Sequence, residues 1–179
     1  MMENIPIYML HDLKHIPDYP LPDGFEFSPL NSEKEGEQWA EITTATSEFP
    51  DKNQALIRFS TELASDLNKA KKRIIFLKTT TGRYAGTACA WFGKWNGETI
   101  GRLHWVEIMP EFQGHKLGRP LIAETLSLLK QYHDKAYLKT QPRSLAAIHL
   151  YLDFGFKPAI HTTEEKRAWN HVFNQLNRD

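Results

Sequence analysis

A two-residue turn between two apolar segments does most to restrict what this chain can fold into. Asn96-Gly97 separates an expected strand over residues 83–93 from another over residues 98–109. Both turn residues tolerate a positive φ, which the tight turns of β-hairpins require. A short apolar run, Ile74-Ile75-Phe76-Leu77, predicts a further strand over residues 73–80. The centre of the chain is therefore predicted to form three antiparallel strands in series.

Helical patterns stand on both sides of these strands. Ser32 and Glu35 form a capping box, so a helix is expected from there to about Glu48. Pro50-Asp51 opens a second helix, whose apolar face predicts an end near Lys69. The remaining pattern predicts a helix after Pro110 to about His133, a strand over residues 135–140, a helix over 145–154, an extended segment over 156–158 and a helix over 164–176. The predicted fold class is α/β of the α+β type, with a single mixed, mostly antiparallel central sheet flanked by helices.

The N-terminal segment differs from the rest of the chain in its proline content. Five prolines fall within the first thirty residues. Because proline fixes φ and lacks a backbone donor, residues 1–30 are expected to form an irregular arm with short extended pieces. The arm is expected to pack on a single domain of residues 31–179, since a chain of 179 residues has the size of one domain.

Charge and cysteine content argue against several classes of function. Lys and Arg number 22, as do Asp and Glu, so the formal net charge is zero and a nucleic-acid partner is not expected. Cys89 is the only cysteine, which excludes an intrachain disulfide, and it is expected to be a small buried residue in a strand. His11 and His15 have no third ligand nearby, so no metal site is predicted. The sequence lacks a signal-peptide pattern and an apolar run of roughly 20 residues, so a cytoplasmic protein without a membrane partner is expected.

The segment that follows the last central strand carries the chemistry that the sequence indicates. It passes through a loop with Gly114 and Gly118 into a helix. Glycine lets a ligand approach the backbone closely, and the free amides and dipole at a helix start attract an anion. Further donor or cationic groups come from His115, Lys116 and Arg119. The pattern predicts a phosphate or pyrophosphate site at residues 113–119, with a plain strand–loop–helix connection as the alternative.

This loop also resembles a known family. Residues 110–118, Pro-Glu-Phe-Gln-Gly-His-Lys-Leu-Gly, are similar to motif A of the GNAT superfamily of N-acetyltransferases, whose pattern is Gln/Arg-x-x-Gly-x-Gly/Ala. Gln113 and Gly118 match that pattern, while Lys116 stands where the family usually has glycine.

A second resemblance lies downstream, at the distance that the family requires. Residues 140–156 are similar to motif B, which commonly reads Asn-x-x-Ala-x-x-x-Tyr-x-x-x-Gly-Phe. Ser144 replaces the usual asparagine. The matching positions are Ala147, Tyr151, Gly155 and Phe156. The two motifs occur in the correct order, and the resemblance spans about residues 73–160.

The resemblance implies transfer of an acetyl group from acetyl-CoA to a primary amine of a small molecule or peptide. The amine would attack directly in a ternary complex, with acetyl-CoA as cosubstrate, no metal, and a monomer or homodimer as the working unit. It also implies a strand edge that pairs with the pantetheine arm and a loop that holds the pyrophosphate. The implied CoA contacts are Val106, Glu107, Ile108, Gln113, Gly114, His115, Lys116, Leu117, Gly118, Arg119, Ser144 and Tyr151.

Two catalytic roles follow from the resemblance and from strand parity. Tyr151 matches the family tyrosine that protonates the leaving thiolate, and its alternative role is a core aromatic with a satisfied hydroxyl. His104 is the predicted base, because it shares strand parity with Val106 and Ile108 and its intrinsic pKa suits proton transfer near neutral pH. Glu107 faces the opposite side by parity and is the second choice, unless a β-bulge shifts the register. A water relay is the third alternative.

Two other functions remain open at this point. Lys116 and Ser144, where the sequence departs from the family pattern, favour a non-catalytic acyl-CoA-binding sensor or partner module. The other open function is that of a structural or protein-binding domain without affinity for CoA. The acceptor is not indicated by any charge run, although one or two of the aromatic residues on or beside the hairpin, Trp91, Phe92, Trp95 and Trp105, are expected to line its pocket.

Overall fold

The central hairpin forms as its turn predicts. In the computed structural model, which describes residues 5–177, Asn96 and Gly97 take φ values of 48° and 84° between two long strands. These strands, β4 (Tyr84–Trp95) and β5 (Glu98–Ile108), are antiparallel, and β4 also pairs antiparallel with β3 (Ile74–Thr79). The predicted series of three antiparallel strands is confirmed.

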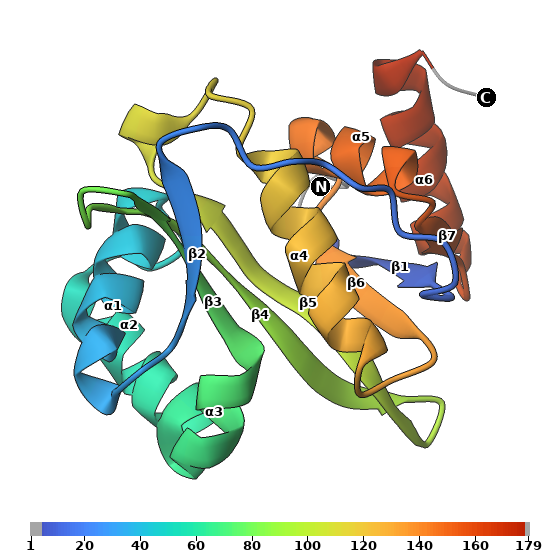
Figure 1. Ribbon diagram of the computed structural model, residues 1–179. Helices are drawn as coiled ribbons and strands as arrows, with labels where there is room; N and C mark the ends of the chain where they lie inside the picture. Colours follow the sequence, from blue (N-terminus) through green and yellow to red (C-terminus); the bar gives the residue numbers. More distant parts are fainter. Residues whose placement is uncertain (1–4, 178–179) are drawn as a thin grey trace.

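Seven strands form one sheet in the order β2-β3-β4-β5-β6-β1-β7. The other four strands are β1 (Ile7–His11), β2 (Phe25–Pro29), β6 (Ala136–Thr140) and β7 (Lys157–Ala159). Every neighbouring pair is antiparallel except β5 and β6, which run parallel. The expected fold class, a mixed and mostly antiparallel sheet flanked by helices, is confirmed (Figure 1).

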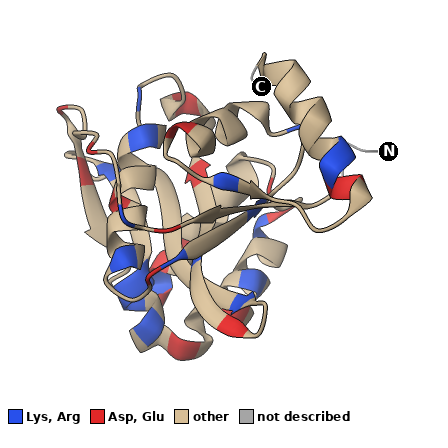
Figure 2. Ribbon diagram, turned by 90° about the vertical axis from the view of Figure 1, so that its right-hand side faces the viewer, with Lys and Arg blue, Asp and Glu red and all other residues tan. Residues whose placement is uncertain are grey.

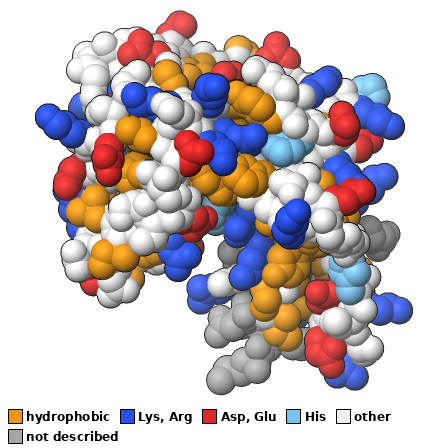
Figure 3. Space-filling model, turned by 90° about the horizontal axis from the view of Figure 1, so that it is seen from below, with side chains coloured by type: hydrophobic (Ala, Val, Ile, Leu, Met, Phe, Trp, Pro, Cys, Tyr) orange, Lys and Arg blue, Asp and Glu red, His pale blue; other side chains and the backbone are white. Residues whose placement is uncertain are grey.

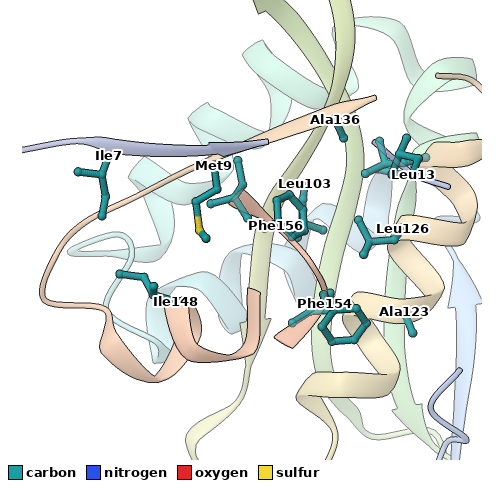
Figure 4. Packing of buried hydrophobic residues seen from close by; sticks show 14 of the residues in the cluster. Ile7, Met9, Leu13, Leu103, Ala123, Leu126, Ala136, Ile148, Phe154 and Phe156 are labelled. Carbon is teal, nitrogen blue, oxygen red and sulfur yellow. The ribbon is translucent and has the colours of Figure 1, made fainter. Parts of the chain in front are cut away.

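Two of these strands come from the first thirty residues. β1 lies between β6 and β7, and its Ile7 and Met9 are fully buried in the cluster shown in Figure 4. The sequence predicts only short extended pieces here, so the predicted element order starts with a helix where the structure has two strands. The prolines obscure these strands because they lie before and between them. Pro29 ends the edge strand β2, where a missing N–H is tolerated.

Two layers of helices cover opposite faces of the sheet (Figure 1). Successive residues of a strand point to opposite faces. Phe76 belongs to the buried cluster under α1, which contains Trp39, and its neighbour Ile75 belongs to the cluster under α4, which contains Leu121. The helices are α1 (Gly36–Ala45), α2 (Lys52–Arg58) and α3 (Leu67–Arg73) on one side, and α4 (Gly118–Lys130), α5 (Leu145–Asp153) and α6 (Thr163–Leu176) on the other.

The second predicted helix is interrupted. Instead of one helix to about Lys69, α2 ends at Arg58 and continues as a π-helical turn over Phe59–Leu63. A short 3₁₀ turn follows, and α3 then begins, because the Asp66 carboxylate accepts a hydrogen bond from the Lys69 amide at 3.1 Å and caps it. Single π-helical turns inside helices are frequent at functional sites. This one carries Glu62, which contacts β5.

Cys89 lies in β4 and is fully buried, as expected for a small strand residue. Burial raises the pKa of its thiol far above the usual range. A buried thiol that stays protonated is inert, so Cys89 serves packing rather than covalent chemistry.

Charged groups of both signs are spread over the molecule. Figure 2 shows Lys and Arg interspersed with Asp and Glu along the ribbon, and the face in Figure 3 mixes apolar, basic and acidic side chains. Within residues 5–177, none of the helices has the length and apolar character needed to span a bilayer.

β5 carries an extra residue near its C-terminal end. Thr87 of β4 pairs with Glu107, and Cys89 pairs with His104. Between these two pairs β5 therefore has two residues where β4 has one. Trp105 takes a φ of 50° at this β-bulge. On the partner strand, Gly86 lies so near that an added Cβ would stand 2.6 Å from the carbonyl oxygen of Glu107.

Replacing Gly86 with alanine should therefore destabilise the protein. The new methyl group meets backbone that cannot move aside without shifting β5, an overpacking cost of about 1–3 kcal/mol. We expect Gly86→Ala to lower the free energy of unfolding by that amount in urea denaturation. Thr99→Ala, an exposed change on the neighbouring strand β5, should cost less than half as much. Equal losses for the two variants would contradict the close approach.

Candidate active site

β5 and β6 pair over only two positions, Gly101 with Ala136 and Arg102 with Tyr137. Beyond them β5 continues to Ile108, paired through its other edge with β4. The edge of β5 that faces β6 is therefore open over this stretch, and its peptide groups are available to a ligand. Two cavities adjoin the opening between the strands.

The first, here the loop cavity, has a volume of about 870 Å³. It lies between the end of β5, the start of α4 and one side of α5, with Val106, Ile108 and Leu150 among its apolar walls. The loop residues Gln113, Gly114, Lys116, Leu117, Gly118 and Arg119 line it as well. So do Tyr19, Pro20 and Pro22 of the N-terminal segment, whose part in the cavity is not indicated by any sequence motif.

The loop cavity has an anion seat built from backbone. Gly114 and Lys116 take positive φ values of 81° and 61°, so the lysine has the left-handed conformation that glycine adopts most readily. Among residues 5–177, the amides of residues 114–119 find no hydrogen-bond acceptor. Free amides at the start of α4 suit a phosphate or pyrophosphate.

Two of the polar loop residues that the sequence singles out already have partners within the protein. The His115 ring nitrogen Nδ1 lies 3.0 Å from the carbonyl oxygen of Phe112, so the ring bonds to the loop itself. Arg119 donates to Asp153 at 2.7 Å and to the Tyr19 hydroxyl at 3.4 Å, so its charge is already partnered.

The second, here the polar cavity, has a volume of about 650 Å³. It lies on the α1 side of β5 and is bounded by the π-helical turn and by the loop between β6 and α5. Its titratable lining residues include Glu48, Arg58, Glu62, Arg102, His104, Glu107, Lys139 and Arg143. Ser144 lines the polar cavity and not the loop cavity, and Trp105 lines it too.

The two cavities meet at three shared residues, Val106, Ala147 and Tyr151. The two cavities therefore adjoin at the Tyr151 side chain. Among residues 5–177, no group of three or more His, Cys, Asp or Glu side chains is placed to hold a metal ion.

The bulge at Trp105 overturns the expected faces of β5. His104 was expected to share a face with Val106 and Ile108, but that prediction is wrong, because the extra residue shifts the alternation by one. His104 and Glu107 both line the polar cavity, whereas Ile108 lines only the loop cavity. Glu107 consequently lies on the polar-cavity side of the opening and not among the loop-cavity residues.

His104 is held in a partly buried hydrogen-bond network. Its Nε2 lies 2.6 Å from Oε1 of Glu62, and Arg58 contacts the same carboxylate at 3.3 Å. The ring also stacks on Trp105, with centroids 4.3 Å apart. Burial lowers the pKa of His104 to about 4, against the opposing charge of Glu62. The imidazole is therefore neutral at neutral pH, with one nitrogen engaged by Glu62.

Glu107 and Tyr151 share a different environment. Burial raises the pKa of Glu107 to about 7; the Thr46 hydroxyl opposes this shift and the charge of Glu48 adds to it. Burial also raises the pKa of Tyr151 above its usual range, with further contributions from Glu107 and Glu48. A carboxyl group that titrates near neutrality thus stands close to a phenol that keeps its proton.

Comparisons with known proteins agree with this geometry. The sequence profile of the acetyltransferase (GNAT) family matches residues 36–156. No curated protein matches the chain by sequence. A GCN5-related N-acetyltransferase from Sphaerobacter thermophilus superposes with a TM-score of 0.65 at 16% identity, over 86% of this chain and 48% of that one. This chain thus spans about half the length of that structure.

Two further solved structures have the same fold. A protein from Pyrococcus horikoshii OT3 has a TM-score of 0.63 and 21% identity, over 77% of this chain and 92% of its own. The glucosamine-6-phosphate N-acetyltransferase from Arabidopsis thaliana has a TM-score of 0.52 and 18% identity, over 78% of this chain and 95% of its own. At these identities the likeness establishes the fold alone.

The left-handed backbone at Lys116 gives a testable stability order. A left-handed conformation costs a residue with a Cβ roughly 1–2 kcal/mol, and glycine does not bear this cost. Lys116→Gly should therefore unfold at a higher denaturant concentration than Lys116→Ala, by about 1 kcal/mol in the free energy of unfolding. If the alanine variant is the more stable one, the loop does not hold the conformation described.

The raised pKa of Glu107 also has a consequence for stability. A carboxyl group whose pKa is higher in the folded state binds protons more tightly there, so stability falls as the pH rises from about 4.5 to about 7. Glu107→Gln removes that loss and should be more stable than the parent by roughly 1–3 kcal/mol at pH 8, but not at pH 4. Denaturation at both pH values measures the difference, with Glu124→Gln, an exposed change on α4, as the control. A gain of the same size at both pH values would show that charge burial is not its cause.

Proposed function

Because this chain belongs to the acetyltransferase (GNAT) family, we propose that it transfers the acetyl group of acetyl-CoA to a primary amine of a small molecule or peptide. The amine attacks directly while both substrates are bound. The observation that carries this proposal is the meeting of the loop cavity and the polar cavity at Val106, Ala147 and Tyr151. The two substrates can each occupy one cavity and react where the cavities join.

The loop cavity suits the acyl donor. The free amides of residues 114–119 can bind the pyrophosphate, and the apolar walls can cover the pantetheine arm. The open edge of β5 over residues 106–108 offers peptide groups to the amides of that arm. One of these backbone amides would polarise the thioester carbonyl as negative charge develops on its oxygen.

We assign the base to Glu107 in preference to His104. Efficient proton transfer needs a base whose pKa lies near the operating pH. The pKa of Glu107, about 7, meets this requirement, whereas His104, with a pKa of about 4, is a weak base. His104 also bonds to Glu62, which gives it the role of fixing the wall of the polar cavity.

We assign the acid to Tyr151, which lines both cavities. As the new N–C bond forms and the C–S bond breaks, the amine proton passes to Glu107 and the departing sulfur takes a proton from Tyr151. Because a thiol is a moderately good leaving group, with an intrinsic pKa near 8.5, this acid accelerates the reaction without being essential to it.

Thiol release from acetyl-CoA over a panel of primary amines tests the function. We expect turnover with at least one amine class, and kcat/KM should rise as the pH passes through about 7. Glu107→Gln should lose that rise, and Tyr151→Phe should lower kcat roughly 10- to 100-fold with an unchanged KM for acetyl-CoA.

The negative result is equally informative. If calorimetry shows tight binding of CoA but no amine releases thiol above background, the protein is a non-catalytic acyl-CoA-binding module. If the pH-dependent rise survives in Glu107→Gln and vanishes in His104→Gln, the base is His104 and our assignment is wrong.

A further inference from the structure

The charges of the polar cavity are separated along β5. The carboxylates of Glu48 and Glu107 line this cavity together with Tyr151, which also lines the loop cavity, and both carboxylates raise the pKa of the Tyr151 phenol. Arg102 lies at the other end, where β5 still pairs with β6. It is five residues before Glu107, a Cα separation of about 13 Å once the bulge is allowed for. Lys139, on the facing strand, lines the same cavity.

Neither Arg102 nor Lys139 forms a salt bridge with a carboxylate among residues 5–177, although the charge of Arg102 contributes to lowering the pKa of Glu62. Arg58, which also lines the cavity, is by contrast paired with Glu62. The Nε atom of Arg102 is buried and makes no hydrogen bond, while its guanidinium lies 5.6 Å from the centroid of the Tyr137 ring. Buried donors without a partner are rare in folded proteins, and such a group in a cavity wall suggests a ligand that accepts its hydrogen bond.

These two cations are also accessible from a second side. Arg102 and Lys139 line a third cavity of about 440 Å³, over β6 and β1, whose walls include Tyr8, Trp95 and Tyr137. They therefore stand between two hollows and can be approached by a solute. A guanidinium and an ammonium that line the same two cavities, neither of them in a salt bridge with a carboxylate, suit an oxyanion.

We propose that the amine acceptor also carries a carboxylate or phosphate group, which Arg102 and Lys139 bind while the amine lies beside Glu48 and Glu107. This inference rests on the function proposed above. The acceptor is then zwitterionic, with the amine and the anion at opposite ends. Because Arg102 and Glu107 are five residues apart along β5, several bonds separate the two groups of the acceptor.

Matched pairs of acceptors test the proposal. The carboxylate pair is 6-aminohexanoate with 6-aminohexanamide, and the phosphate pair is 6-aminohexyl phosphate with 6-amino-1-hexanol. We expect kcat/KM in the thiol-release assay to be roughly 10- to 100-fold higher for at least one anionic member than for its neutral partner. The pair with the larger ratio identifies the anion.

Substitutions at the cation site give a second readout. Arg102→Gln should raise the KM of the anionic acceptor at least tenfold and leave both its kcat and the KM of acetyl-CoA nearly unchanged. Arg102→Lys should restore part of the loss. Arg167→Gln, at an exposed arginine of α6 that lines none of the three cavities, is the control and should change neither constant. Calorimetry with the product 6-acetamidohexanoate checks the same contact without turnover, and thermal unfolding shows whether each variant is folded.

The outcomes separate the inference from the function on which it rests. If neutral and anionic acceptors react equally well, and Arg102→Gln changes kcat/KM equally for both, the proposed anion site is wrong while the acetyltransferase function stands. If no amine of either kind releases thiol, the function itself fails, and the inference fails with it.

Discussion

The early separation of β5 from β6 is the constraint on which the rest of the site depends. Only two residue pairs join these strands, so the remainder of β5 keeps one edge free. Beside this free edge, Ile108 of β5 lines the loop cavity. On the other face of the sheet, His104 and Glu107 line the polar cavity. A fully paired β6 would close the passage in which Tyr151 stands, and the two cavities would no longer meet.

The bulge at Trp105 decides which chemistry reaches that passage. Without the extra residue, Glu107 would share the face of Leu103, which packs in the buried cluster with Leu126 of α4. With it, Glu107 lies on the same face as His104, while Ile108 lines only the loop cavity and Val106 borders both cavities. The tryptophan itself packs toward the helices, against Trp39 and Phe49. One residue in a left-handed conformation thus separates the apolar from the polar half of the site.

Much of the architecture follows from local sequence signals. Asn96-Gly97 fixes the hairpin, the capping box at Ser32 starts the first helical segment, and Gly155, with a φ of 90°, ends α5 as a terminating glycine should. The loop at residues 113–119 and the helix with Tyr151 are also placed by their motifs. The loop residues are predicted as anion ligands, and they remain a prediction, as do the oligomeric state and the cytoplasmic location.

The rest depends on contacts that no local pattern encodes. The strand β1 is recognisable only once its buried partners in β6 and α5 are known, since prolines surround it. The bulge arises from the pairing of two strands and has no glycine to mark it, so counting alternate residues along β5 gives the wrong face for His104. The pKa of Glu107 likewise depends on burial by segments far away in the chain, including Thr46 and Glu48.

The burial of Cys89 has a practical consequence for anyone who studies this protein in solution. Since its only thiol is sealed beneath the first helical layer, a disulfide-exchange dye such as dithiobis(nitrobenzoate) should leave the folded chain colourless. Colour that appears while the fold is intact then reports small-molecule sulfhydryl alone. Under denaturing conditions the same dye should react with one thiol per chain, and the rate of that reaction measures global unfolding.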